Sequence, residues 1–229
     1  MKNIPSTKIL FLDIETVPLV SSWEELPEKW QNLWAKKVEN QLKENETAAE
    51  FYSKRAGILA EFGKIICISC GIIENDVLRL KSFYGDDERL LLTEFIELLN
   101  SPYFHQGVFL CAHNGKEFDF PYLGRRILIN GLDLPKALDI QGKKPWEIPH
   151  LDTMELWKFG DYKHYTSLNL LAAVFDIPTP KDDIDGSQVA EVYYKDHDLE
   201  RIKVYCEKDV LTLAQIFRKM RNETLLEVE

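Results

Sequence analysis

Near the N-terminus of this sequence, an apolar run ends in two carboxylates and so limits the folds that the chain can adopt. Ile9 to Leu12 are all apolar, which is typical of a central strand covered by helices on both faces. Since residues i and i+2 of a strand point to the same face, Asp13 and Glu15 would project side by side. Neighbouring buried acids repel each other and lose hydration, and a divalent cation relieves both costs. The stretch favours an α/β fold with a metal site at the carboxyl end of this strand, where ligands of such sheets gather. The same stretch is equally compatible with a strand that ends at Asp13 and a solvated loop that begins at Glu15.

Length and composition indicate an ordinary globular protein. A chain of 229 residues suits one domain, or one domain with an insertion, and can bury a sizeable core. Hydrophobic residues make up 45% of the sequence and charged residues 29%. No apolar run approaches the length of a membrane span, and the N-terminus lacks the pattern of a signal peptide. We therefore expect a single domain over residues 1–229 that is cytoplasmic and has no membrane partner.

The net charge limits how the chain can bind nucleic acid. A formal charge of −10 weighs against a protein that binds nucleic acid mainly by electrostatics. It does not exclude an enzyme that holds a few nucleotides at a carboxylate and metal site with a local basic rim. Candidates for such a rim are Arg125, Arg126, Lys143, Lys144 and Lys163, although basic pairs of this kind more often belong to an ordinary solvated surface.

The four cysteines give no pattern of a zinc site. Cys67 and Cys70 are three residues apart in a predicted strand, so their side chains point to opposite faces of it. Cys111 and Cys206 lie elsewhere, in a predicted strand and a predicted helix. We therefore expect buried thiols.

A helical insertion is expected at residues 19–60, lying on the sheet near the site. Ser22 and Glu25 have the spacing of a capping box, and Pro27 suits the first turn of a helix. Trp23, Trp30, Trp34 and Val38 recur at spacings of seven, four and four residues, which places them on one face of a helix. Packing explains these tryptophans better than stacking on bases does.

The remaining pattern predicts an α/β fold with a mixed five-stranded central sheet flanked by helices. Further strands are expected at residues 64–73, 77–84, 108–112 and 150–154. Helices are expected at residues 86–100, 117–130, 167–175, 186–194 and 198–221.

Three separate stretches contribute acids that could meet at one place. The first contains Asp13 and Glu15. In the second, residues 114–119, Asp119 falls in the first turn of a predicted helix. In the third, Tyr205 and Asp209 are four residues apart and therefore share one face of the last helix. Each stretch is a weak signal alone, and the three together are specific.

These stretches resemble the three motifs of the DEDD 3′-to-5′ exonuclease superfamily. The matching residues are Asp13-Ile14-Glu15-Thr16, Asn114 with Phe118-Asp119, and Tyr205 with Asp209. The histidine branch would carry His five residues before the last Asp, where this chain has Val204, so Tyr205 indicates the tyrosine branch. The chain is most similar to the predicted exonucleases related to the proofreading domain of family B DNA polymerases, from Ile9 to about Met220.

The resemblance implies a ribonuclease H-like fold and hydrolysis of single-stranded nucleic acid from its 3′ end. It implies that Asp13, Glu15 and Asp209 hold a cation that carries the attacking water, that Asp13 bridges to a second cation, and that Asp119 acts on the second. Tyr205 would orient the water. Two such ions about 4 Å apart would both activate water and stabilise the leaving oxygen, and oxygen ligands suit Mg²⁺ or Mn²⁺.

Several residues are candidates for substrate contacts, with DNA favoured over RNA as the substrate. Asn114 and Gly115 lie where the backbone can approach a nucleotide closely. Phe118 suits either stacking on the terminal base or packing in the core. Thr16 completes the expected substrate-binding set. For Asp152 we expect a structural role, and for Lys181 a solvated side chain or a phosphate contact.

Two other functions are compatible with parts of the pattern. An apolar strand followed by Asp13-x-Glu15-Thr16 resembles the start of the aspartyl-nucleophile phosphatases, and Asp182-Asp183 could supply their paired acid. That family would have Asp at position 15, and the alternative gives residues 114–119 and 205–209 no role. The other alternative is a catalytically inactive nucleic-acid-binding module of the same fold.

Overall fold

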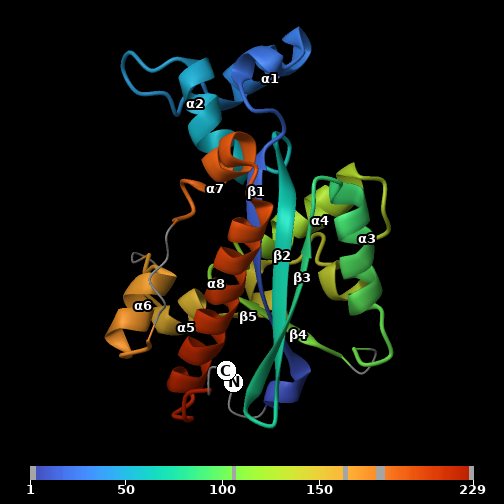
Figure 1. The fold of residues 1–229 in the computed structure, drawn as a ribbon, viewed down its shortest axis with the longest axis vertical. Coiled ribbons are helices and arrows are strands. Elements are labelled where there is room, and N and C mark those ends of the chain that lie inside the picture. The colour runs from blue at the N-terminus through green and yellow to red at the C-terminus, as the bar shows by residue number, and fades with distance from the viewer. Residues whose placement is uncertain (1–3, 105–106, 162–164, 179–183, 227–229) are drawn as a thin grey trace.

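The computed structural model describes residues 4–104, 107–161, 165–178 and 184–226. Its centre is a five-stranded sheet with the strand order β3-β2-β1-β4-β5 (Figure 1). The strands are β1 (Ile9–Pro18), β2 (Gly63–Glu74), β3 (Val77–Tyr84), β4 (Phe109–Ala112) and β5 (Leu151–Asp152). β1, β2 and β3 pair antiparallel, whereas β4 is parallel to both β1 and β5. The mixed five-stranded sheet expected from the sequence is thus confirmed.

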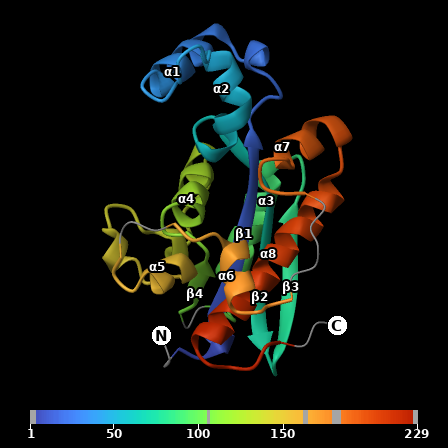
Figure 2. The same cartoon turned by 90° about the vertical axis from the view of Figure 1, so that its left-hand side faces the viewer.

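Helices cover both faces of this sheet, as the apolar residues of β1 require. Leu10, Leu12 and Ile14 point to one face, where they pack with residues of α3 (Glu88–Leu99) and α4 (Asp119–Ile129). Ile9 and Phe11 point to the other face and pack against α8 (Leu199–Met220). Figures 1 and 2 show α8 running along the sheet on the side opposite α3 and α4. The chain also forms α5 (Thr153–Lys158), α6 (Leu168–Val174) and α7 (Val189–Glu191), which continues into one π-helical turn.

The insertion between β1 and β2 forms its own apolar cluster. It contains α1 (Glu28–Val38) and α2 (Ala48–Arg55), which lie beyond the end of the sheet in both views. The expectation that this segment lies on the sheet is therefore wrong. The reason is that its apolar side chains pack on one another: Trp34 is fully buried, with ring centroids 5.2 Å from Tyr52 and 5.1 Å from Phe62. Packing, the role favoured for the tryptophans, is confirmed for Trp34.

Two local expectations are also corrected. Ser22 does not cap the turn after it through its side chain, and the capping box lies instead at Thr47 and Glu50, at the start of α2. The predicted strand at 150–154 is only two residues long, because Asp152 accepts hydrogen bonds from the backbone N–H groups of Met154 and Glu155 and so starts α5.

The unequal lengths of β1 and β4 create the place where the site forms. The parallel pairing joins only Ile9–Phe11 to Phe109–Cys111, and β4 ends at Ala112. From Asp13 onward, no strand of the described residues pairs with this edge of β1, and α4 begins beside it. On its other side β1 pairs with β2, where the register shifts between Glu15 and Thr16. Bulges of this kind are common beside active sites.

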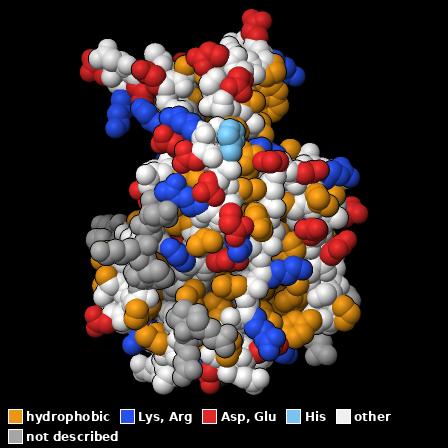
Figure 3. Space-filling view, in the orientation of Figure 1, with side chains coloured by type: hydrophobic (Ala, Val, Ile, Leu, Met, Phe, Trp, Pro, Cys, Tyr) orange, Lys and Arg blue, Asp and Glu red, His pale blue; other side chains and the backbone are white. Residues whose placement is uncertain are grey.

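The surface has mixed charge. On the face shown in Figure 3, acidic and basic side chains are interspersed with apolar ones. None of the helices in the described ranges combines the length and the hydrophobicity that crossing a bilayer requires.

Candidate active site

Asp13 and Glu15 project from β1 toward α8. The alternation that directs Ile9 and Phe11 to α8 continues through these two acids, so the side-by-side arrangement expected from the sequence is present. Glu15 is 7% exposed and Asp13 is partly buried. The first motif therefore presents two carboxylates to the last helix rather than to a solvated loop.

The last helix brings the third motif beside the first. The Cys206 thiol donates to the Asp13 carboxylate, with 3.4 Å between Sγ and Oδ2. Potential ligand atoms of Asp13, Glu15 and Cys206 lie within 4.8 Å of one another. Tyr205 hydrogen-bonds Asp209 one turn away, and the charge of Asp209 acts on both β1 acids. For Cys206 the sequence predicts only a buried thiol, although its position three residues before Asp209 places it on this face of the helix.

Asp119 fills the open edge of β1. It is the first residue of α4, is 3% exposed, and accepts a hydrogen bond from the backbone N–H of Ile14. Its charge acts on Asp13. The five residues that the sequence suggested for catalysis therefore meet at one place: Asp13, Glu15, Asp119, Tyr205 and Asp209.

The electrostatics of this cluster disfavour four ionised carboxylates. Burial, and then the charges of Asp119 and Asp209, raise the pKa of Asp13 well above its ordinary value. Burial, and then Asp13 and Asp209, raise the pKa of Glu15 in the same way. Burial is also the main cause that raises the pKa of Asp119 to about 7. Burial, followed by the nearby Asp209 charge, raises the pKa of the Tyr205 phenol, so this group stays protonated at neutral pH.

The donor set fits divalent cations with a preference for oxygen. The largest electrostatic contributions at Asp13 and Glu15 come from other acids and raise both pKa values, which is the unfavourable state that a bound cation relieves. Carboxylate oxygens suit Mg²⁺ or Mn²⁺ better than they suit zinc. The residues that could hold such ions are Asp13, Glu15, Asp119 and Asp209.

Asp152 positions the loop between β4 and α4. Its carboxylate accepts hydrogen bonds from the backbone N–H groups of Asn114 (3.0 Å) and Lys116 (3.1 Å), in addition to those that start α5. Its charge also contributes to the raised pKa of Asp119. This bears out the structural role expected for Asp152. The sequence signal is an Asp three residues before Glu155, a spacing typical of a helix start.

The candidate substrate residues differ in what their surroundings allow. Asn114 has a positive φ of 64°, and its Oδ1 atom is buried with no hydrogen-bond partner among the described residues. Gly115 is buried, and a Cβ atom there would lie 2.4 Å from Cβ of Ala112, so packing alone requires this glycine. Phe118 is partly buried and packs with its ring centroid 5.3 Å from that of Tyr122.

Thr16 lies just after the register shift of β1 and hydrogen-bonds the Tyr122 hydroxyl group. This places it against α4, two residues beyond Ile14. Thr16, Asn114 and Phe118 therefore border the same open edge of β1 that holds Asp119.

The basic rim is smaller than the sequence suggested. Arg126 is buried and donates to Glu88, with 2.8 Å between Nε and Oε1, so its assignment to the rim is wrong. Its neighbour Arg125 is exposed, as are Lys143 and Lys144. Four residues considered above lie outside the described ranges: Lys163, Lys181, Asp182 and Asp183.

Comparisons with known proteins identify the fold and the family of the chain. Among solved structures, the chain is similar to the family B DNA polymerase from the hyperthermophilic archaeon Pyrobaculum calidifontis, with a TM-score of 0.53 and 14% identity over 95% of this chain and 26% of that one. It is also similar to exonuclease I, with a TM-score of 0.46 and 11% identity over 93% of this chain and 42% of that one. At such identities the likeness to the polymerase shows the fold alone, a ribonuclease H-like fold. No curated protein matches the chain.

A sequence-family profile matches residues 58–224, which include Asp119, Tyr205 and Asp209, whereas Asp13 and Glu15 precede the matched range. The match covers well over half of the sequence. The chain belongs to the family of predicted 3′-5′ exonucleases related to the exonuclease domain of PolB.

Proposed function

We propose that the protein is a metal-dependent exonuclease of the tyrosine-bearing DEDD branch, which hydrolyses single-stranded nucleic acid from its 3′ end. The observation that carries the proposal is the convergence of four acids, from β1, α4 and α8, whose β1 members have strongly raised pKa values. Such a cluster is unfavourable without a cation and well suited to holding two. The proposal treats residues 1–229 as one domain with an insertion at 19–60.

Each acid has a distinct role in the proposal. Asp13, Glu15 and Asp209 would hold one cation, and Asp13 and Asp119 would hold the second. Two bound Mg²⁺ or Mn²⁺ ions would supply activation of water and stabilisation of the leaving oxygen. Tyr205 keeps its proton, so its phenol orients the attacking water by a hydrogen bond and does not act as the base.

The terminal nucleotide would occupy the open edge of β1. The buried Oδ1 of Asn114 is an unused acceptor there, and a hydroxyl group of the terminal sugar would satisfy it. Gly115 keeps the loop close to β4, while Thr16 and Phe118 border the base. Because the carboxylates are largely buried, a single strand reaches them more easily than a duplex does. We favour DNA as the substrate.

A catalytically inactive binding module of the same fold remains the second candidate. Membership of the exonuclease family argues against the phosphatase alternative, and the acids at 182 and 183 on which that alternative depends lie outside the described residues. All four carboxylates and the tyrosine are present, so nothing in the site favours loss of activity.

The test is digestion of 5′-labelled single-stranded DNA and RNA of one sequence with Mn²⁺, Mg²⁺ or chelator. We expect a ladder that shortens from the 3′ end and is absent in chelator and in Asp13→Asn. Binding of the strand without any cleavage in either metal would favour the inactive module instead.

Tyr205→Phe should reduce cleavage less than loss of a carboxylate does. The variant removes the hydrogen bond that orients the water but leaves all four carboxylates in place, so we expect a decrease of about 10- to 100-fold in kcat. Single-turnover assays against the wild type measure it, with melting temperature as the control for folding. A loss as large as that of Asp13→Asn would show that the phenol has a more direct role than positioning.

A further inference from the structure

Two hollows meet beside the loop that leads to Asp119. The first, which we call the Asn114 hollow, measures about 490 Å³ and is lined by Asn114, Asp152 and Trp146 among others. The second, which we call the α4 groove, measures about 320 Å³ and lies along the outer side of α4. Lys116 and Pro145 line both hollows, so the two adjoin each other. The Asn114 hollow reaches the loop that carries Asn114 and leads to Asp119, although none of the four clustered acids lines either hollow.

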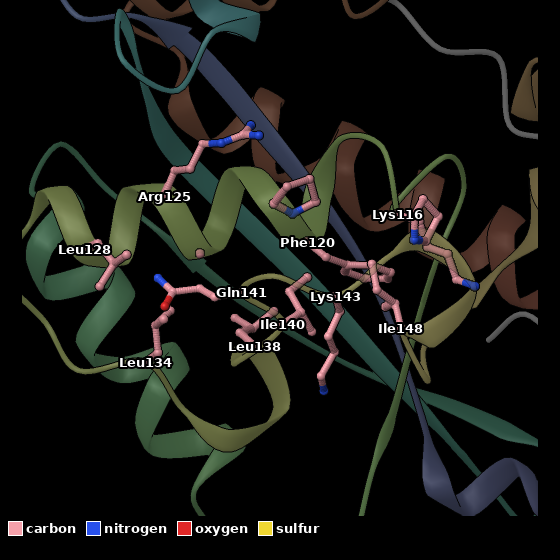
Figure 4. Close-up of a pocket in the computed structure, with 13 residues that line it drawn as sticks. Lys116, Phe120, Arg125, Leu128, Leu134, Leu138, Ile140, Gln141, Lys143 and Ile148 are labelled. Carbon is pink, nitrogen blue, oxygen red and sulfur yellow. The ribbon is translucent and has the colours of Figure 1, made fainter.

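The α4 groove combines an apolar floor with cations. Leu134, Leu138 and Ile140 contribute to its floor, and its lining includes Lys116, Arg125 and Lys143 but no acid. Figure 4 shows the three cations on different sides of the pocket, with Leu138 and Ile140 between them. No ion pair of Arg125 or Lys143 is present in the described part of the chain. Lys116 pairs with Glu155, so Arg125 and Lys143 supply the unpaired positive charge of this groove, in a protein whose net charge is −10.

An exposed aromatic side chain lines the Asn114 hollow, next in sequence to a residue that both hollows share. Trp146 is 74% exposed, lines the Asn114 hollow, and follows the shared Pro145. The Lys144 ammonium group lies 5.2 Å from the centre of its ring. An exposed indole beside a cation is the combination that binds a base by stacking and its phosphate by charge.

Two of the acids that line the Asn114 hollow already have partners. Asp152 is occupied by backbone N–H groups, and Glu155 pairs with Lys116 at 2.6 Å. Glu117 and Asp161 also line this hollow, so phosphates are better accommodated in the α4 groove.

We propose that the Asn114 hollow and the α4 groove bind the single-stranded nucleic acid that precedes the 3′-terminal nucleotide. Bases would stack on Trp146 and on the apolar floor, while Arg125 and Lys143 contact phosphates. The inference rests on the proposed function, since it assigns the path of the strand whose end reaches the carboxylates. It predicts an enzyme that prefers substrates several nucleotides long.

The test measures binding in chelator, where no cleavage can occur. Fluorescein-labelled dT3, dT12 and rU12 are titrated with the full chain, and anisotropy gives Kd. We expect dT12 or rU12 to bind at least about tenfold more tightly than dT3, because only the longer strand reaches the groove. The tighter of the two identifies the preferred sugar.

Charge reversal and truncation of the groove residues should remove this preference. Arg125→Glu with Lys143→Glu should weaken binding of the 12-mer by about tenfold or more and lower the salt slope by about 1.4, since each phosphate contact to a single strand contributes about 0.7. Trp146→Ala should weaken binding by about tenfold, whereas Trp146→Phe should retain most of it. Lys81→Glu is the control for each charge reversal made singly, since it changes the net charge by the same amount, and Lys81 is exposed on β3 at the other edge of the sheet.

The outcomes separate this inference from the proposed function. The groove assignment would be wrong if dT3 bound as tightly as the 12-mers. It would also be wrong if Lys81→Glu weakened binding as much as the groove variants do at unchanged melting temperature. Cleavage could still occur in both cases. Binding that depends on strand length and is lost in the groove variants would support the groove assignment, even if no cleavage were found. In that case only the exonuclease proposal would fail.

Discussion

Asp13→Asn is expected to lower the rate of cleavage by at least ~10³-fold while leaving the protein folded. Asp13 lies at the centre of the cluster, because it faces Glu15, Asp119 and Asp209 and would contact both cations. The amide has the shape of the carboxylate but lacks its charge. The measurement is single-turnover digestion of a 5′-labelled oligonucleotide with Mn²⁺, together with circular dichroism of the variant.

The matched control for this variant is Glu207→Gln. Glu207 lies on α8, two residues before Asp209, but its carboxylate accepts a hydrogen bond from Ser82 of β3 at 2.7 Å and so lies outside the cluster. We expect the control to cleave like the wild type. Cleavage by Asp13→Asn at the wild-type rate would contradict the assignment of the whole site.

Asp13→Asn should also stabilise the metal-free protein. The pKa shifts of the clustered acids set the direction of this effect and its dependence on pH. Asp13, Glu15 and Asp119 have pKa values in the folded state above their ordinary values, so the folded state binds more protons than the unfolded state. The free energy of unfolding therefore falls as the pH rises from about 4, the ordinary pKa of a carboxyl group, through the raised pKa of each acid. For Asp119 that raised pKa is about 7. In chelator at pH 8 we expect Asp13→Asn to raise the melting temperature by about 2 to 4 °C, the equivalent of ~1 kcal/mol in a protein of this size.

That gain should be smaller at pH 5, where the wild-type cluster retains protons, and Mn²⁺ should stabilise the wild type but not the variant. Thermal scans at both pH values, with and without Mn²⁺, measure these differences. A variant that is less stable than the wild type at pH 8 in chelator would show that the acids do not repel one another as described.

Arg126→Met is expected to lower the free energy of unfolding by about 3 to 5 kcal/mol, because it leaves a buried carboxylate without its partner. Arg126 is 4% exposed and donates to both carboxylate oxygens of Glu88 and to the carbonyl oxygen of Ala60. Glu88 in turn accepts from the backbone N–H of Ile65 at 2.7 Å. The pair therefore joins α3 and α4 to the start of β2. Urea denaturation of both proteins measures the difference.

The neighbouring arginine supplies the control. Arg125→Met makes the same chemical change one residue away, but Arg125 is exposed, so we expect a change within about 0.5 kcal/mol. Adding Glu88→Gln to Arg126→Met should recover part of the loss, since the buried negative charge is then absent. Equal effects of the two arginine substitutions would contradict the buried pair.

The motifs of the site were predictable because their chemistry is local. Strand alternation places Asp13 and Glu15 on one face, and a spacing of four places Tyr205 and Asp209 on one face of a helix. The mixed sheet followed from the order of apolar runs and periodic segments. By contrast, the position of residues 19–60 was predicted wrongly, because an amphipathic helix pattern shows that a face is buried but does not show what covers it.

The residues that could carry the chemistry, and the face of the strand or helix on which each lies, follow from the order of amino acids alone. Which of these faces meet depends on how distant segments pack. The tertiary structure placed Cys206 against Asp13 across 193 positions of sequence and paired Arg126 with Glu88 across 38. It likewise directed the Asp152 carboxylate to the backbone of the loop at Asn114, and it left Arg125 exposed in the α4 groove and Trp146 exposed in the Asn114 hollow. The physical reason is that periodicity is a property of neighbouring residues, whereas burial and pairing depend on which distant segments pack together.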